Sequence, residues 1–562
     1  MNLAPPLKKN DNITLQIDNL GSEGQGIGRY NGFAVFVPYA LPGEIVEAHI
    51  IKVAKNYAIG KLISITSTSP NRVEPQCSAF LKCGGCALQH LEYEEQLEFK
   101  RRQVADALER IGGFVGIHVE KTLGMPEPKR YRNKASFPFA ETENGVELGF
   151  YAINSHRLIP VDDCMIQGKE CMSAMRIVRI WANKYSIPAY DERTGNGILR
   201  NLMVRTTGLG EIMVTVVTSG ELPHADDLVS MLREGVSDLK AVAHNINPQN
   251  TNVILGGQYK TIWGSGYVTE HICGLRFDVS AASFLQVNTA QMELLYQSVM
   301  KLLNIRQDET VLDIYCGIGT ITLLAAKRAE KVIGIEEVSQ AVEDAVRNAR
   351  KNAIDNAMFI CDSAEDVLPT LVAQGVSADC IILDPPRKGC HESVLRAIAQ
   401  SYAKRIAYVS CNPATLARDC KTLAAMGYEI KCVQPVDMFC ETAHVETVVM
   451  LSHKKPDSVI NVKVEFGEGE GKVPLDNIAK RAEVYKPKER VTYKMIKEYI
   501  EAKYGFKVHT AYIAEVKREL GLPMYDAPNA VEELKQPRKH PTAEKVEAIK
   551  EALKHFEIIR SC

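Results

Sequence analysis

The chain has 562 residues, 46% of them hydrophobic and 24% charged, which is the composition of a globular protein with room for about three or four domains. It contains no apolar run of about eighteen residues and no apolar stretch after its first residues, so we expect a cytoplasmic protein without a membrane span or secretory signal. Because the formal net charge is only −2, a nucleic acid would have to be held by a local basic patch.

The first predicted element is a small β-barrel between about Asp11 and Ser67. Short apolar stretches there are separated by the glycine-rich turn 21–28 and by Pro42-Gly43, a spacing typical of compact all-β domains. Such barrels either hold oligonucleotides on one face or only mediate contacts between domains. Three lysines favour the RNA-binding alternative for this domain, which we set at residues 8–68: Lys52, Lys55 and Lys61.

A cysteine cluster follows the barrel. The chain has 15 cysteines, too few and too unevenly spaced for a secreted disulfide scaffold, so clustered ones indicate metal ligands or nucleophiles. Cys77, Cys83 and Cys86 form a C-x5-C-x2-C pattern, and Cys164 would add a fourth thiolate. Four thiolates hold either zinc or a [4Fe-4S] cluster, and the spacing does not separate the two.

The next region, residues 69–285, has mixed secondary structure. After the cysteines we expect a helix with apolar residues at Leu97, Val104, Leu108 and Ile111. Residues 129–139, KRYRNKASFPF, alternate cations with aromatic residues in a strand-like stretch. This pattern favours an edge strand that contacts RNA phosphates, and a merely solvated edge strand is the alternative.

From Val311 to Leu451 strands and helices alternate, which predicts a doubly wound parallel sheet. The strand ending at Asp313 leads into Tyr315-Cys316-Gly317-Ile318-Gly319 and then a helix, and Glu336 and Asp362 end the next two strands. An acidic residue at the end of the second strand suits ribose hydroxyls. The third glycine of the dinucleotide fingerprint is absent, so S-adenosylmethionine fits better than a dinucleotide.

Asp384-Pro385-Pro386 follows a further predicted strand and places a carboxylate at the edge of the sheet where ligands bind. Methyltransferases that act on amino groups use a similar turn that ends in an aromatic residue. Arg387 stands at that position here, which argues against methylation of an exocyclic amine.

Cys411 lies in Ser410-Cys411-Asn412-Pro413, between an apolar strand and a predicted helix from Ala414. A free thiol is ordinarily a core residue, but this loop sequence is poorly suited to burial. A helix that begins just behind the thiol would lower its pKa, so we predict a nucleophile. Carbon methylation of a pyrimidine then needs a base to remove the C5 proton, and Glu446 is the candidate.

After residue 453 the composition becomes polar and glycine-rich, and we expect a linker followed by a small helical appendix over residues 454–562. Helical patterns cover Tyr493 to Tyr504 and Thr510 to Leu520, and Thr542 begins a last helix that extends to about Ile558. The first two have helix-turn-helix spacing, although short amphipathic helices most often simply pack together.

Residues from about Asp11 to Leu451 resemble the RNA 5-methyluridine methyltransferase family, and most closely its iron–sulfur 23S rRNA type with an N-terminal TRAM domain. The resemblance implies a [4Fe-4S] cluster instead of zinc, and it implies a nucleophile and a base in the catalytic domain. The implied residues are Cys77, Cys83, Cys86 and Cys164 for the cluster, Gln286, Tyr315, Glu336 and Asp384 for S-adenosylmethionine, Cys411 as nucleophile and Glu446 as base.

The resulting expectation is an α/β protein with a doubly wound, Rossmann-like class I methyltransferase domain at residues 286–453, an OB-like TRAM barrel, a mixed central domain and a helical C-terminal appendix. We expect it to methylate C5 of uridine in structured RNA, with 23S rRNA favoured and without an obligatory protein partner or a membrane. The alternatives are a tRNA T-loop uridine-5 methyltransferase and a non-catalytic RNA-binding iron–sulfur protein.

Overall fold

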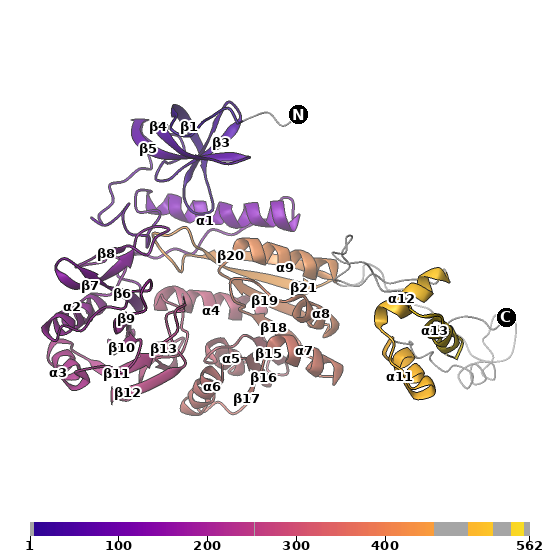
Figure 1. The fold of residues 1–562 in the computed structure, drawn as a ribbon. Coiled ribbons are helices and arrows are strands. Elements are labelled where there is room, and N and C mark those ends of the chain that lie inside the picture. The colour runs from indigo at the N-terminus through magenta and orange to yellow at the C-terminus, as the bar shows by residue number, and fades with distance from the viewer. Residues whose placement is uncertain (1–4, 252, 455–492, 521–540, 556–562) are drawn as a thin grey trace. The chain divides into compact units, whose positions relative to one another are not determined.

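The computed structural model describes residues 5–251, 253–454, 493–520 and 541–555 (Figure 1). The contacts divide the chain into two compact units, residues 1–455 and residues 456–562. Among the described residues, no helix combines the length and the apolar character needed to cross a membrane.

The first unit begins with a closed five-stranded barrel whose strands run in the order β1-β2-β3-β5-β4. Alternate residues of β1 and β4 point inward, so Ile17, Val46 and Ile50 are fully buried. Closure pairs every strand on both sides and so removes the sheet edges. The strands are β1 (Asn12–Leu20), β2 (Gly26–Tyr30), β3 (Phe33–Val37), β4 (Ile45–Val53) and β5 (Tyr57–Ser67).

Helix α1 (Tyr93–Ala107) follows the cysteine region and continues for one turn as a π-helix, Leu108–Gly112. Val104 and Leu108 pack into the core of the catalytic domain, whereas Phe99 packs with Leu88 near the barrel. One helix therefore contacts both the barrel region and the catalytic domain (Figure 1).

The central domain is a seven-stranded sheet of order β12-β11-β10-β9-β6-β7-β8, with α2 and α3 packed against it over a core that includes Phe137 and Trp181. Strand β6 is paired with β9 on one side and β7 on the other, so the prediction of an edge strand was wrong. The elements are β6 (Lys134–Thr142), β7 (Gly145–Tyr151), β8 (Leu158–Pro160), α2 (Lys169–Lys184), β9 (Leu199–Thr206), β10 (Ile212–Thr218), α3 (Ala225–Gly235), β11 (Leu239–Ile246) and β12 (Gln258–Gly264), followed by the hairpin β13 (Tyr267–Ile272) and β14 (Leu275–Ser280).

The catalytic domain contains a second seven-stranded sheet, of order β17-β16-β15-β18-β19-β21-β20. Its strands pair in parallel except for β21, which is antiparallel to both of its neighbours. The predicted doubly wound sheet is confirmed. Its strands are β15 (Thr310–Ile314), β16 (Lys331–Glu336), β17 (Ala357–Cys361), β18 (Cys380–Leu383), β19 (Arg405–Ser410), β20 (Tyr428–Val436) and β21 (Glu446–His453).

Helices cover both faces of this sheet, because alternate residues of each strand point to opposite sides. Val311 packs with α4–α6, whereas Leu312 and Ile314 pack with α7–α9. Parallel strands covered in this way bind ligands at their carboxyl ends. The helices are α4 (Thr289–Leu303), α5 (Thr320–Ala326), α6 (Ser339–Lys351), α7 (Ala364–Ala373), α8 (Glu392–Gln400) and α9 (Pro413–Ala425).

The described part of the second unit consists of α11 (Tyr493–Tyr504), α12 (Thr510–Glu519) and α13 (Ala543–His555). Their apolar residues form one core, so the amphipathic helices pack together as in the simpler of the two predicted alternatives. The predicted linker and the last predicted residues before Ile558 lie outside the described residues. The core residues include Ile496, Ile500, Ile513, Val516, Ile549 and Leu553.

Candidate active site

The carboxyl ends of four parallel strands supply four of the predicted site residues. Strand β15 runs into Tyr315 and the glycine turn, β16 ends at Glu336, β18 is followed by Asp384, and β19 is followed by Cys411. Parallel neighbours in a sheet bring these ends to one edge, so residues almost a hundred positions apart in sequence meet there.

A cavity opens at the glycine turn, and we call it the glycine-turn cavity. Gln286, Tyr315 and Asp384, three of the four predicted cofactor residues, line it together with Gly317. The fourth, Glu336, holds the turn, since its carboxylate accepts hydrogen bonds from the backbone N–H of Gly317 at 3.0 Å and of Val338 at 2.9 Å.

The backbone of this turn is shaped for close approach of a ligand. Gly317 has φ of 55°, and no described atom lies within 4 Å of the position that a Cβ would take. Tyr315 has φ of 69°, a left-handed conformation that costs a side-chain-bearing residue energy and recurs at functional sites. The open backbone and the acid of Glu336 fit S-adenosylmethionine, whose ribose hydroxyls need such an acceptor.

Asp313 lines the same cavity and was not among the predicted site residues. Its side chain is buried, and Thr322 Oγ1 donates a hydrogen bond to it at 2.6 Å. Burial raises the pKa of Asp313 from its ordinary value of 3.8 to about 7, and the carboxylates of Asp384 and Glu336 add to the shift. Its place near the end of a strand, just before a glycine turn, is the signal in the sequence that could have identified it.

The Cys411 loop is anchored on both sides. Asn412 caps α9, because its Oδ1 accepts a hydrogen bond from Ala414 N at 3.0 Å. Asn412 Nδ2 and Thr415 Oγ1 donate to the carbonyl oxygen of Arg387 at 3.2 and 3.3 Å. The Cys411 loop and the Asp-Pro-Pro-Arg turn are therefore held together as one structural piece.

The electrostatic surroundings of Cys411 differ from the expectation that α9 lowers its pKa. Burial raises the pKa of the Cys411 thiol, and the carboxylates of Glu446 and Asp384 raise it further. The Arg387 guanidinium opposes this shift through its charge and a hydrogen bond to the thiol. Desolvation and the two nearby acids outweigh the opposing effect of Arg387, which is the cation that favours the thiolate.

Glu446 begins β21, opposite Val436 of β20, and only 3% of it is exposed. Its Oε2 is buried without a hydrogen-bond partner among the described residues. Burial and the neighbouring Asp384 raise the pKa of Glu446 well above its ordinary value, whereas Arg387 opposes the shift. A carboxylate with a raised pKa is a stronger base, and this one has a free acceptor oxygen.

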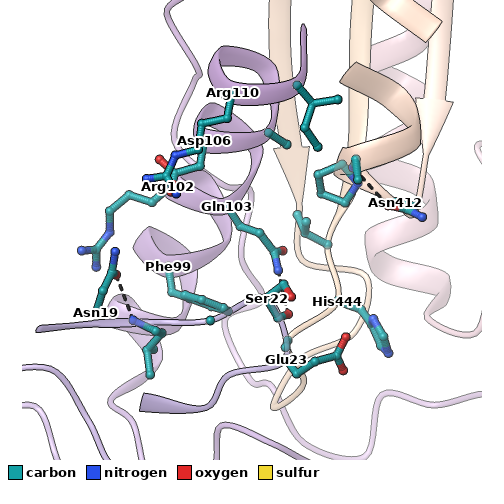
Figure 2. Close-up of a pocket in the computed structure, with 18 of the residues that line it drawn as sticks. Asn19, Ser22, Glu23, Phe99, Arg102, Gln103, Asp106, Arg110, Asn412 and His444 are labelled. Atoms are coloured by element: carbon teal, nitrogen blue, oxygen red, sulfur yellow. Dashed lines mark hydrogen bonds and ion pairs between the residues drawn. The ribbon is translucent and has the colours of Figure 1, made fainter. Parts of the chain in front are cut away.

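A cavity of about 710 Å³ lies in front of Cys411, between the barrel and α1, and we call it the Cys411 cavity. Figure 2 shows that one face of α1 lines it, opposite Asn412 and His444, and that Gln103 reaches the barrel. Gln103 Nε2 donates to the carbonyl oxygen of Ser22 at 2.8 Å. The helix residues, spaced for one helical face, went unnoticed in the sequence: Phe99, Arg102, Gln103, Asp106 and Arg110.

The four predicted cluster cysteines line one further cavity of about 370 Å³, the four-cysteine cavity. In the described ranges no group of three or more His, Cys, Asp or Glu is arranged to hold a single metal ion. Burial raises the pKa of Cys86 to about 12, with the thiols of Cys164 and Cys83 adding to the shift, so four thiolates here would need compensating positive charge. An all-thiol donor set in one cavity fits an iron–sulfur cluster.

The comparison with protein families identifies two segments. Residues 232–454 match the tRNA (uracil-5-)-methyltransferase family, and residues 6–63 match the TRAM domain. The second match covers most of the five-stranded barrel, so the predicted TRAM identity of that barrel is confirmed.

Relatives match a larger share of the chain than the two family segments do. A Clostridium tetani protein named as an RNA methyltransferase is 45% identical over 450 residues, which are 80% of this chain and 98% of that protein. A Listeria monocytogenes protein with the same description is also 45% identical and covers 80% of this chain and 99% of its own length. About a fifth of this chain therefore has no counterpart in these relatives.

One solved structure is similar over most of the chain. It is the Pyrococcus abyssi tRNA (uracil-54, C5)-methyltransferase in complex with S-adenosyl-L-homocysteine, with 29% identity and a TM-score of 0.64. The match covers 78% of this chain and 99% of that one. The predicted fold class is confirmed by this likeness and by the barrel.

Proposed function

This chain belongs to the tRNA (uracil-5-)-methyltransferase family, and we propose that it methylates C5 of a uridine in structured RNA with Cys411 as nucleophile and Glu446 as base. The family gives the coarser function directly: the protein is an S-adenosylmethionine-dependent RNA (uracil-C5-)-methyltransferase. The observation that carries the proposal is the meeting of Cys411, Asp384, Arg387 and Glu446 at one sheet edge, beside the glycine-turn cavity.

The proposed reaction begins with the Cys411 thiolate. Its sulfur adds to C6 of the uridine, which moves the electron pair of the C5–C6 double bond onto C5 and O4. Arg387 stabilises the attacking thiolate, because its guanidinium is the group that lowers the thiol pKa. S-adenosylmethionine, which Gln286, Tyr315, Glu336 and Asp384 would hold, would supply the methyl group to C5 and leave as S-adenosylhomocysteine.

Glu446 completes the proposed reaction. It accepts the proton from the methylated C5, and the returning electron pair restores the C5–C6 bond and expels the Cys411 thiolate. The unpartnered Oε2 of Glu446 leaves an acceptor available for this proton. Because C5 and C6 are covered in a base stack, the uridine must be flipped out or lie in an open loop.

We further propose that Cys77, Cys83, Cys86 and Cys164 hold a [4Fe-4S] cluster. The shared cavity of the four thiols supports this assignment. The methyl transfer involves no net electron transfer, so a structural role or a role in RNA contact suits the cluster better than redox catalysis.

We propose a separate role for each of four segments of the chain, and we place the protein in the cytoplasm. Residues 8–68 bind RNA as a TRAM barrel, residues 69–285 carry the cluster and an RNA-contacting region, residues 286–453 catalyse methyl transfer, and residues 454–562 form an extension. The TRAM match at residues 6–63 supports the first of these boundaries.

We favour 23S rRNA as the substrate because of the length of the chain, the cysteine cluster and the N-terminal barrel. A transfer RNA T-loop is the second candidate, and the likeness to a tRNA (uracil-54, C5)-methyltransferase favours it.

A deletion strain tests both candidates. Its 23S rRNA and tRNA are digested separately, and 5-methyluridine is measured in each by mass spectrometry. Loss from 23S rRNA supports the first substrate and loss from tRNA alone supports the second. Unchanged 5-methyluridine in both RNAs, with a wild-type strain as reference, would contradict the proposed function.

A further inference from the structure

A further cavity, of about 520 Å³, lies in the central domain, and we call it the aromatic cavity. The mechanism proposed above does not use it. Its lining residues come from the sheet strands β6, β7 and β9 and from the loops beside them. Among them are Phe139, Phe150, Tyr151, Tyr190, Arg200 and Asn201.

The aromatic cavity adjoins the four-cysteine cavity, which in turn adjoins the Cys411 cavity. Arg387 and His444 line both the Cys411 cavity and the four-cysteine cavity. Ser136 and Phe150 line both the four-cysteine cavity and the aromatic cavity. The three cavities are therefore neighbours, in an order that leads from Cys411 past the cysteines into the central domain.

The walls of the aromatic cavity present rings that are already held in place. The Tyr151 ring stacks on His156 with a centroid separation of 5.1 Å. The Arg200 guanidinium lies over the Tyr190 ring at 4.5 Å from its centroid. Arg200 is fixed in turn by hydrogen bonds to the carbonyl oxygens of Asn247 at 2.7 Å and Gln249 at 2.6 Å. Such preorganised aromatic and guanidinium planes are the surfaces on which unstacked bases lie.

Unpaired polar groups in the four-cysteine cavity offer a nucleotide both a hydrogen-bond donor and an acceptor. In the four-cysteine cavity, Arg132 Nε and Gln167 Oε1 are buried without a hydrogen-bond partner among the described residues, and Gln167 is only 4% exposed. Arg132 Nε is a hydrogen-bond donor and Gln167 Oε1 is an acceptor. Thiolates and inorganic sulfides mainly accept hydrogen bonds, so a cluster alone leaves the acceptor unsatisfied. A ribose hydroxyl or a base edge can both donate and accept.

Asn201 offers the same kind of group in the aromatic cavity. Its Oδ1 accepts a hydrogen bond from Ser136 Oγ at 2.7 Å, and no described residue accepts from its Nδ2. The carboxylate of Glu192, which also lines the cavity, is paired with His156 at 2.6 Å. A contact within the protein therefore already engages one oxygen of this carboxylate.

We propose that the aromatic cavity binds an unstacked nucleobase of the same RNA, and that the nucleotides between this base and the target uridine pass along the four-cysteine cavity. The proposal rests on the proposed function, because the RNA enters at Cys411. The central domain would then contribute to the choice of RNA substrate, because a base that stacks there adds binding affinity away from the reacting uridine.

Binding of full-length protein to RNA tests the assignment. The probes are 23S rRNA and tRNA transcribed in vitro, the variant is the double substitution Tyr151→Leu and Tyr190→Leu, and the readouts are the Kd, KM and kcat for RNA. We expect the Kd and KM for the methylated transcript to rise about tenfold, since stacking of one base on aromatic rings is worth roughly 1–3 kcal/mol. The kcat at saturating RNA should stay within about twofold, because the cavity does not touch the reacting atoms.

Two control variants separate lost stacking from lost fold. Tyr151→Phe with Tyr190→Phe keeps both rings and should keep wild-type affinity. Tyr402→Leu removes a tyrosine that is 73% exposed and lines none of the three cavities, and it should also leave the Kd unchanged. In addition, irradiation of transcripts carrying 4-thiouridine should crosslink the wild-type protein within the peptides that contain Tyr151 or Tyr190.

The outcomes are distinguishable. If the wild type methylates a transcript but the leucine variant binds it equally well and the crosslinks map elsewhere, the aromatic cavity holds another ligand and only this assignment fails. An equal loss of affinity in the leucine and phenylalanine variants would also overturn it. If the wild type methylates neither transcript, the proposed function fails and this assignment falls with it.

Discussion

At the scale of single residues, the site contains buried acidic groups and one cation, Arg387, that opposes the rise in pKa. Burial raises the pKa values of Cys411, Glu446 and Asp384, and Arg387 counteracts this for both the thiol and Glu446. Arg387, noted in the sequence mainly as evidence against amine methylation, is thus an electrostatic partner of the nucleophile.

The roles of Cys411 and Glu446 predict two different failures. Cys411→Ala should reduce methylation by at least about 10³-fold while RNA affinity survives, because the covalent step is lost. Glu446→Gln should stall after methyl transfer and leave RNA covalently attached, because the C5 proton cannot be removed. Methylation assays, gel retardation and denaturing gels measure these effects, with circular dichroism as a check of folding. Methylation by the alanine variant at the wild-type rate would exclude Cys411 as nucleophile.

Asp313 predicts a dependence of stability on pH. Its pKa rises from 3.8 to about 7 on folding, so the folded state binds the proton more tightly than the unfolded state. Its favourable contribution is therefore present below about pH 4 and is lost as the pH rises through 7. Asp313→Asn should leave the free energy of unfolding little changed near pH 4. Near pH 8 the same substitution should raise the free energy of unfolding by a few kcal/mol. Urea unfolding at both pH values measures this, and an equal effect at both would contradict it.

At the scale of elements, α1 links the barrel region to the catalytic domain. Lys100 and Asp437 form an ion pair in which both side chains are 0% exposed. Lys100 also donates to Phe439 O at 3.0 Å, and Tyr93 OH donates to Asp437 at 2.7 Å. This network holds the segment that leads to Glu446, so α1 helps to set the position of the base.

The buried pair predicts a large effect of breaking it. Lys100→Met should lower the free energy of unfolding by about 3–5 kcal/mol, because Asp437 would stay buried without its cation. The double variant Lys100→Met with Asp437→Leu should recover part of this loss, since no isolated charge remains. Urea unfolding of the two variants and the wild type measures both effects. A single variant as stable as the wild type would show that the pair is not desolvated in solution.

At the scale of the whole molecule, two units have separate cores. The first contains the barrel, the central domain and the catalytic domain, and the curated relatives match about this length. The second has its own small core on α11, α12 and α13. Each unit buries its own apolar side chains, which is the physical condition for independent folding.

Truncation after Lys454 tests this independence. The shortened protein should keep the melting temperature of the first unit within about 2 °C, which for a unit of this size corresponds to about 2 kcal/mol. It should also keep methylation of the RNA that the deletion strain identifies. Calorimetry and the methylation assay measure both, with the full chain as reference. A melting temperature lower by more than about 5 °C would show that the extension stabilises the first unit.

The sequence by itself determined the elements whose signals are local. The alternation of strands and helices, the glycine turn before Thr320 and the loop that places Cys411 ahead of a helix all depend on neighbouring residues, and the structure has them in the predicted order. Only the tertiary structure decided the relations between distant segments. It placed β6 between two strands instead of at an edge, and it turned a face of α1 toward Cys411. It also raised the pKa of Cys411, because burial and facing carboxylates act through space and leave no pattern along the chain.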